Sequence, residues 1–281
     1  MTSKNKAILC IILSAFFFAL MSFFVRLSGD VPTVQKSFFR NAIAALCALP
    51  IFLKKHQTFN IGKDRLTTLF FRSLCGTLGL LLNYYSIDHM NLSDANMLNK
   101  LSPFFAILAS IFILSEIPKK TDWAAVVIAF AGALLILKPS FNMQFFYGMT
   151  AAVGGLFTGI AYTLVRKLGT DGVDSSVIIL GFSTFSCLFA LPPSFFYGFH
   201  MTMTQLGILV LAGVSAAAAQ FAITTAYTLA PAKNISVFEY TQIIFAALLG
   251  MAFLGQLPDA LSFLGYAIII ASAVLKQKFS D

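Results

Sequence analysis

The stretch ISVFEYTQIIFAALLGMAFL, residues 235–254, decides the fold of this chain. It is a run of twenty mostly apolar residues that contains one carboxylate, Glu239. A helix of roughly 20 apolar residues crosses a hydrocarbon core about 30 Å thick. Because a charge inside such a span is costly, it usually faces a bundle interior or a watery cavity and marks a functional site. Glu239 is therefore the first candidate for a functional role.

The same stretch has a counterpart earlier in the chain. A shift of 140 positions aligns ANMLNKLSPFFAILASIFILSEIP, residues 95–118, with ISVFEYTQIIFAALLGMAFLGQLP, residues 235–258, without a gap. Pro118 then meets Pro258, and scattered identities continue into the next apolar run. A register that is shared through two spans and their turn favours a duplicated chain.

The composition places the whole chain in a lipid bilayer. Of its 281 residues, 58% are hydrophobic and 11% are charged, and the mean hydropathy is +0.85. Soluble domains carry about 25% charged residues. The net charge of +8 does not indicate a nucleic-acid partner, because the basic residues form no stripe on one surface.

Apolar stretches bounded by charged or turn-forming residues predict an all-α integral membrane protein with ten transmembrane helices. The expected spans are 7–27, 36–53, 66–87, 95–115, 121–138, 145–165, 175–197, 204–226, 234–254 and 260–277. Lys and Arg are enriched in cytoplasmic loops. With a cytoplasmic N-terminus, 14 of the 19 basic residues lie on the inner side: Lys4, Lys6, Lys54, Lys55, Lys63, Arg65, Arg72, Lys119, Lys120, Arg166, Lys167, Lys233, Lys276 and Lys278. This pattern predicts a multi-pass protein of the cell (cytoplasmic) membrane with both termini in the cytoplasm.

The repeat and the span count together predict two inverted five-helix repeats, residues 1–140 and residues 141–281. Because five is odd, the second half enters the membrane from the opposite side to the first. Inverted repeats recur in secondary transporters, whose substrate site lies near the midplane where the repeats meet. The sequence therefore predicts alternating access, with the two halves rocking about a central site that binds a small-molecule substrate.

Three stretches carry a resemblance to a known family: LSPFFAILASIFILSEIP at residues 101–118, TQIIFAALLGMAFLGQLP at residues 241–258, and FFRN at residues 38–41. On them the chain resembles the drug/metabolite transporter superfamily, specifically the ten-span type built from two EamA-like halves. The resemblance implies a secondary transporter and favours export of amino acids or similar small metabolites from a bacterial cytoplasm. Uptake of a vitamin, nucleobase or nucleotide derivative remains open.

The second half departs from the family pattern at two positions. Ile243 stands opposite Pro103, and Gln256 stands opposite Glu116. A family role of the proline or the glutamate therefore transfers only to the first half. Arg40 matches the arginine common in EamA-like chains, and we expect it to be structural.

The two central spans carry polar stripes, because residues three and four apart share one helix face. Two such stripes that meet across a pseudo-twofold axis line a cavity. The predicted substrate-binding residues on these spans are Asn96, Asn99, Lys100, Ser236, Glu239 and Tyr240, and those on neighbouring spans are Tyr84, Tyr162 and Gln220. Each neighbour taken alone is more typical of an interhelical hydrogen bond.

Glu239 has three interpretations at this stage. It carries a coupling proton, it pairs with an amine of the substrate, or it forms a standing ion pair with Lys100. For Lys100 the alternative is that its long side chain reaches the outer interface. Pro103 predicts a helix kink that frees backbone carbonyls, either for a ligand or only for packing.

Enzyme and cofactor signatures are absent from the sequence. His56, His89 and His200 fall in three different loops, so the sequence predicts no metal site, and it contains no Walker A loop. We expect no enzyme activity, no cofactor, and a monomer or homodimer. The rival interpretation is a flippase or accessory membrane protein that handles a lipid-linked intermediate, and a membrane enzyme is a weaker third.

Overall fold

The computed structural model of the chain describes residues 3–55, 58–115, 119–138, 143–229 and 236–279, and these residues form helices and connecting turns with no strand. The elements are α1 (Ser3–Leu27), α2 (Thr33–Lys54), α3 (Lys63–His89), α4 (Leu92–Asn99), α5 (Ser102–Ile113), α6 (Lys120–Leu137), α7 (Met143–Thr170), α8 (Ser175–Tyr197), α9 (Met203–Leu229), the 3₁₀ helix η1 (Ser236–Tyr240), α11 (Thr241–Leu254) and α12 (Ala260–Phe279).

Ten helical spans run through the described residues. Eight of them are long and apolar enough to cross a membrane, and Phe238–Leu254 and Ala260–Leu275 are shorter apolar helices. The prediction of an all-α membrane protein is confirmed, and every expected span overlaps an observed one. The observed helices are often longer than the apolar runs, because helical hydrogen bonding continues into the polar interface after the hydrophobic pattern stops.

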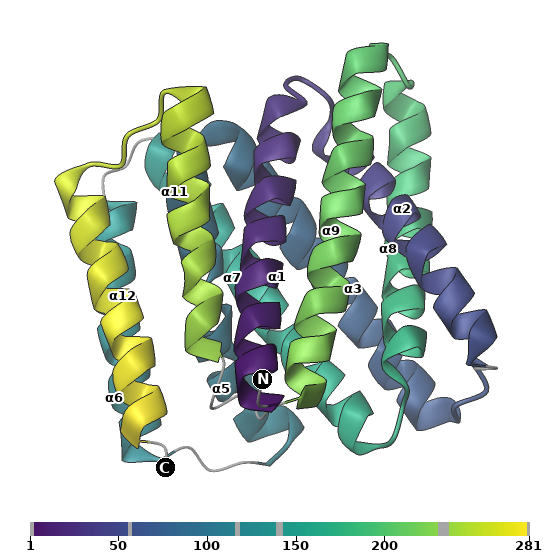
Figure 1. Cartoon of the computed structure of the whole chain (residues 1–281), viewed down its shortest axis with the longest axis horizontal. Coiled ribbons are helices and arrows are strands. Elements are labelled where there is room, and N and C mark those ends of the chain that lie inside the picture. Colours follow the sequence, from purple (N-terminus) through teal and green to yellow (C-terminus); the bar gives the residue numbers. More distant parts are fainter. Residues whose placement is uncertain (1–2, 56–57, 116–118, 139–142, 230–235, 280–281) are drawn as a thin grey trace.

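The helices of the two repeats are interleaved in one bundle (Figure 1). Helix α1 packs on α9 as α3 packs on α7, and α1 contacts α11 as α5 contacts α7. Helices α2 and α8 pair with each other, as do α6 and α12. Each contact maps onto its counterpart when the repeats are exchanged, as a pseudo-twofold axis requires.

This packing corrects the expectation that the two sequence halves rock as separate bodies. The most extensive helix contacts join one half to the other, so neither half has a core of its own. A moving body in this bundle therefore contains helices from both repeats. Both ends of the chain lie at the same end of the bundle in Figure 1, as an even number of spans requires.

Both central spans are interrupted at equivalent positions. Helix α4 stops at Asn99 and α5 starts at Ser102, while η1 gives way to α11 after Tyr240. Pro103 lies in the first turn of α5, immediately after the interruption. Its counterpart is Ile243, so the second interruption forms without a proline, and proline is not the sole cause of either break.

Ser115, just beyond α5, adopts a left-handed backbone with φ of 54°, and Gly255 occupies the equivalent place after α11 with φ of 63°. Left-handed backbone costs a residue with a Cβ roughly 1 kcal/mol, whereas glycine adopts it freely. We expect Ser115→Gly to raise the free energy of unfolding by about 1 kcal/mol and Gly255→Ser to lower it by a similar amount. Thermal unfolding in detergent measures both, and a destabilised Ser115→Gly protein would contradict the conformational argument.

Candidate functional site

The two helix interruptions face each other and are joined by an ion pair. Lys100 Nζ lies 3.1 Å from Glu239 Oε2, and both side chains are about nine-tenths buried, at 11% and 10% exposure. The hydroxyl of Tyr240 donates to the backbone carbonyl oxygen of Lys100 at 3.3 Å. Phe104 N, the usual partner of that carbonyl in a continuous helix, bonds to Leu101 O instead. The break in the first central span thus frees the carbonyl oxygen of Lys100, which accepts a hydrogen bond from Tyr240 of the second span.

Asn96 holds three helices together. Its Oδ1 accepts from Ser22 of α1 at 3.1 Å and from Gln242 of α11 at 2.8 Å, and its Nδ2 donates to Leu92 O at 2.7 Å. Through these bonds Asn96 positions α4 against α1 and α11. The side chain of Ser236, which aligns with Asn96 in the repeat, lies outside the part of the chain that the structure describes.

Helix α7 approaches the first interruption closely because it carries glycine there. A Cβ at Gly155 would lie 3.0 Å from Asn99 O, and one at Gly159 would lie 2.6 Å from Ser102 O. This GxxxG stretch therefore serves packing inside the bundle. The close approach brings Tyr162, one turn further along α7, within electrostatic range of Lys100 and Glu239.

Tyr162 lies among charges from four parts of the fold. It is 43% exposed, yet it is within electrostatic range of Lys100, Glu239, Arg72 and Arg40. Among the described residues, Asn99 Nδ2 at the same interruption is buried with no hydrogen-bond partner.

A second polar cluster surrounds Phe182 of α8. A small cavity of about 10 Å³ is lined there by Arg40, Ala44, Arg72, Ile179, Phe182, Ser183 and Gln220. Tyr84, fully buried, interacts electrostatically with Arg40. The predicted site residues Gln220 and Tyr84 thus belong with the two arginines, whereas Lys100, Glu239 and Tyr240 form the ion-pair cluster.

Sequence reasoning missed Arg72. We counted it as a marker of the cytoplasmic side, but its side chain is only 6% exposed and it lies inside the bundle against Phe182. Its place well inside the apolar run of α3 was the available signal. Arg40, expected to be structural, donates to Asn41 Oδ1 at 2.6 Å.

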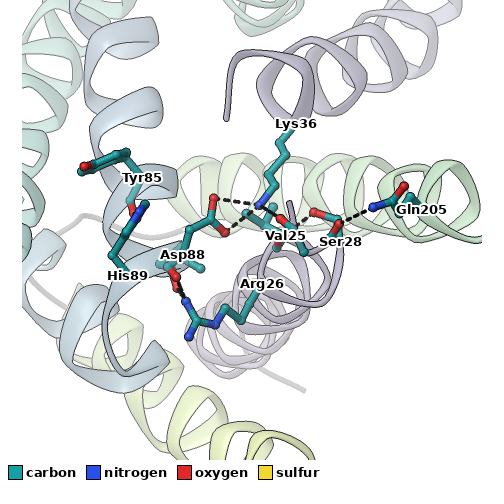
Figure 2. Close-up of polar contacts among 10 residues, drawn as sticks. Val25, Arg26, Ser28, Lys36, Tyr85, Asp88, His89 and Gln205 are labelled. Carbon is teal, nitrogen blue, oxygen red and sulfur yellow. Dashed lines mark hydrogen bonds and ion pairs between the residues drawn. The ribbon is translucent and has the colours of Figure 1, made fainter. Parts of the chain in front are cut away.

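One end of the bundle is closed by a polar cluster that Figure 2 shows. Lys36 is completely buried, and its Nζ contacts both carboxylate oxygens of Asp88, at 2.6 and 2.7 Å, and donates to Gly29 O at 2.9 Å. Arg26 donates to Ile87 O at 2.8 Å and also to the carbonyl of Asp88. These bonds tie α1 and α2 to the end of α3.

Further hydrogen bonds extend the closure of this end. Gln35 donates to Gly198 O at 2.8 Å, which joins α2 to the end of α8. Tyr266 of α12 donates to Asp94 of α4 at 2.5 Å. The backbone N–H of Leu92, at the start of α4, donates to Gln256 Oε1 at 2.9 Å. The glutamine that departs from the repeat thus supplies an acceptor to this N–H group. Its counterpart Glu116 lies outside the described residues.

The opposite end of the bundle contains a larger cavity. Its volume is about 110 Å³, and it is lined by Ala48, Ile51, Lys55, Ser175, Ser176, Ile179, Phe221 and Thr225. Ile179 also lines the cavity between the arginines, so the two spaces adjoin. At the rim, Lys55 and Asp174 form an ion pair at 3.0 Å. Burial opposes ionisation of Asp174, but hydrogen bonds from Ser176 and Lys55 hold its pKa below the usual value.

Comparison with known proteins identifies the two halves. The model of the EamA-like transporter family matches residues 5–138 and again residues 146–276. The pseudopaline exporter CntI of Pseudomonas aeruginosa is 30% identical over 96% of this chain and 95% of its own length. A riboflavin transporter of Vibrio cholerae is 28% identical over 89% of this chain and 84% of its own length.

A human protein and a solved structure are also similar to this chain. Human solute carrier family 35 member G1 is 27% identical over 94% of this chain and 76% of its own length. A solved crystal structure superposes on 96% of each chain with a TM-score of 0.68 at 13% identity, which shows the shared fold alone. The family and these named relatives are transporters.

Proposed function

Because this chain belongs to the EamA-like transporter family, we propose that it is a secondary transporter of the cytoplasmic membrane that exports a small organic metabolite, such as an amino acid. Both termini then lie in the cytoplasm, at the end of the bundle where the larger cavity opens. The Lys36–Asp88 end faces outward.

The observation that carries this proposal is the buried Lys100–Glu239 pair at the two helix interruptions. Interrupted helices of inverted repeats present backbone and charged groups to substrates and coupling ions near the midplane. An ion pair at that place joins the two repeats, and a ligand or a proton can break it. The closed outer end and the cavity at the inner end support an inward-facing state.

The mechanism that follows is an exchange of partners at Glu239. A proton on Glu239, or an amine of the substrate beside it, removes the attraction that holds Lys100. Tyr240 on the same element and Tyr162 from α7 are the other titratable groups near this pair. Export is favoured over uptake by the similarity to an exporter along nearly the whole chain.

Transport measured in proteoliposomes tests this role. We expect Glu239→Gln to slow transport at least about tenfold and to remove its pH dependence, because the side chain can no longer gain or lose a proton. Asp64→Asn, which neutralises an exposed carboxylate in the first turn of α3, is the matched control and should transport normally.

Two outcomes would contradict the proposal in different ways. Unchanged transport by the Glu239→Gln protein across the pH range would remove Glu239 from the mechanism. If lipids stabilise the purified protein and no soluble metabolite is transported, the lipid-handling function replaces metabolite transport.

A further inference from the structure

We propose that Arg40 and Arg72 bind a carboxylate group of the transported molecule, so that the substrate is an organic acid or an amino acid. This inference rests on the proposed transport function and assigns the chemical class of its substrate. It concerns the cluster around Phe182, which the Lys100–Glu239 mechanism does not use.

The two guanidinium groups lie against one aromatic ring. The Cζ of Arg72 is 3.9 Å from the centroid of Phe182, and the Cζ of Arg40 is 5.6 Å from it. Both arginine side chains are only 6% exposed. A guanidinium that lies over a ring face is held by a cation–π interaction, and its N–H groups, which lie in its own plane, stay available for other acceptors.

Arg40 Nη1 donates to Asn41 Oδ1, but three other guanidinium nitrogens have no acceptor among the described residues. Arg40 Nε, Arg72 Nε and Arg72 Nη1 are buried with no hydrogen-bond partner in the part of the chain that the structure describes. No carboxylate of these described residues forms an ion pair with either arginine. The carboxylate of Asp88 is engaged by Lys36. Two buried positive charges therefore lie close together, and no described carboxylate pairs with either of them.

A carboxylate supplies what this cluster lacks. Its two oxygens match the fork of guanidinium donors, and its negative charge offsets both arginines. Ser183 and Gln220 add polar groups to the cavity lining. An amine placed here would meet two like charges, so the amine of an amino acid belongs at Glu239 instead. Tyr162 lies within electrostatic range of both charged clusters and thus between the two ends of such a molecule.

The two cavities define the path of the carboxylate to the arginines and the helix movement that its binding requires. The larger cavity at the inner end adjoins the cavity between the arginines through Ile179. The cavity between the arginines, at about 10 Å³, admits roughly one oxygen-sized group. Binding of a whole carboxylate therefore requires α2, α8 and α9 to separate slightly, which couples substrate entry to helix movement.

Thermal unfolding with paired ligands tests the inference. Full-length protein in detergent is titrated with succinate and L-alanine, each against its carboxamide, succinamide and L-alaninamide, and with inorganic phosphate. We expect a carboxylate to raise the melting temperature and its carboxamide to have no effect. Arg72→Gln and Arg40→Gln should each weaken that carboxylate's apparent Kd at least about tenfold, as expected for a lost charge-assisted hydrogen bond.

Two further variants separate binding from structure. Arg72→Lys keeps the charge but loses the fork, so its affinity should fall between those of the wild type and Arg72→Gln. Arg65→Gln removes an exposed arginine of the same helix and should bind as the wild type does. Without ligand, Arg72→Gln should melt no lower than the wild type, because it removes an uncompensated buried charge.

Several results would overturn the assignment. One is a melting temperature that rises equally with carboxylates and carboxamides, or that rises with no carboxylate, or with phosphate alone. Another is an Arg72→Gln protein that is less stable than the wild type and yet binds carboxylates normally. Transport of uncharged metabolites by the wild type and Arg72→Gln alike would overturn it and leave the transport function standing. Carboxylate binding that depends on Arg72, without transport of any compound, would support the site and overturn the transport function.

Discussion

Replacing Lys100 by Met or Glu239 by Gln is expected to lower the free energy of unfolding, by about 3–5 kcal/mol for Lys100→Met, because the remaining buried charge loses the opposite charge that lies 3.1 Å from it. The pair is about nine-tenths buried, so water cannot solvate the remaining charge well. The loss should be smaller for Glu239→Gln, since the amide oxygen still accepts a hydrogen bond from Lys100 Nζ. Chemical denaturation in detergent measures each value.

The double variant Lys100→Met with Glu239→Gln is the control for this prediction. It removes both charges together, so most of the stability should return, because a buried pair replaced by neutral groups is often close to neutral in stability. Transport should stay lost in the double variant. A double variant that is as unstable as Lys100→Met would show that the side chains act through packing rather than charge.

Asp88→Asn is expected to open the outward end of the protein. Lys36 is fully buried, and Asp88 supplies its counter-charge through both carboxylate oxygens. Loss of that charge should destabilise the closed arrangement by about 3–5 kcal/mol, as for other broken buried pairs. The protein should then populate a state in which α2 separates from the end of α3, and transport should slow because the outer end no longer closes.

Cysteine labelling from the outer side measures this opening. A Tyr162→Cys side chain near the Lys100–Glu239 pair should react slowly with a membrane-impermeant reagent in a background without the native cysteines. Adding Asp88→Asn should raise the labelling rate at least about tenfold, in line with the loss of a buried pair. Asp259→Asn, at an exposed carboxylate that pairs with Lys138 instead, is the matched control. Equal labelling rates in both variants would show that the Lys36–Asp88 pair does not hold the outer end closed.

The sequence predicted the spans well because the bilayer imposes a strong and local requirement. Each crossing segment must be apolar for about 20 residues and must satisfy its own backbone hydrogen bonds. The equivalence of residues 95–118 and 235–258 was also readable, and Pro103 indicated the first interruption, but Ile243 gave no signal for the second one. The pairing of Lys100 with Glu239 was one of three interpretations, since a pattern of polar positions shows a face but not the partner that it meets.

Other parts of the site could not be read from sequence. Arg72 follows the same positive-charge pattern as the exposed Arg65 at the start of α3, and only packing shows that Arg72 lies buried against Phe182. Lys36 and Asp88 fall at the edges of predicted spans, where a charge normally reaches water. Their contact depends on α2 and α3 lying side by side, which no local pattern encodes.

By itself, the sequence determined the membrane environment, the ten spans, the duplication and the opposite orientation of the two repeats, because these follow from hydrophobicity and chain connectivity alone. Tertiary structure decided which repeat each helix packs against, which end of the bundle is closed, and which buried charges have partners. The physical reason is that a buried charge is compensated by groups brought near it through folding, and those groups, such as Lys100 and Glu239, lie 139 residues apart in the chain.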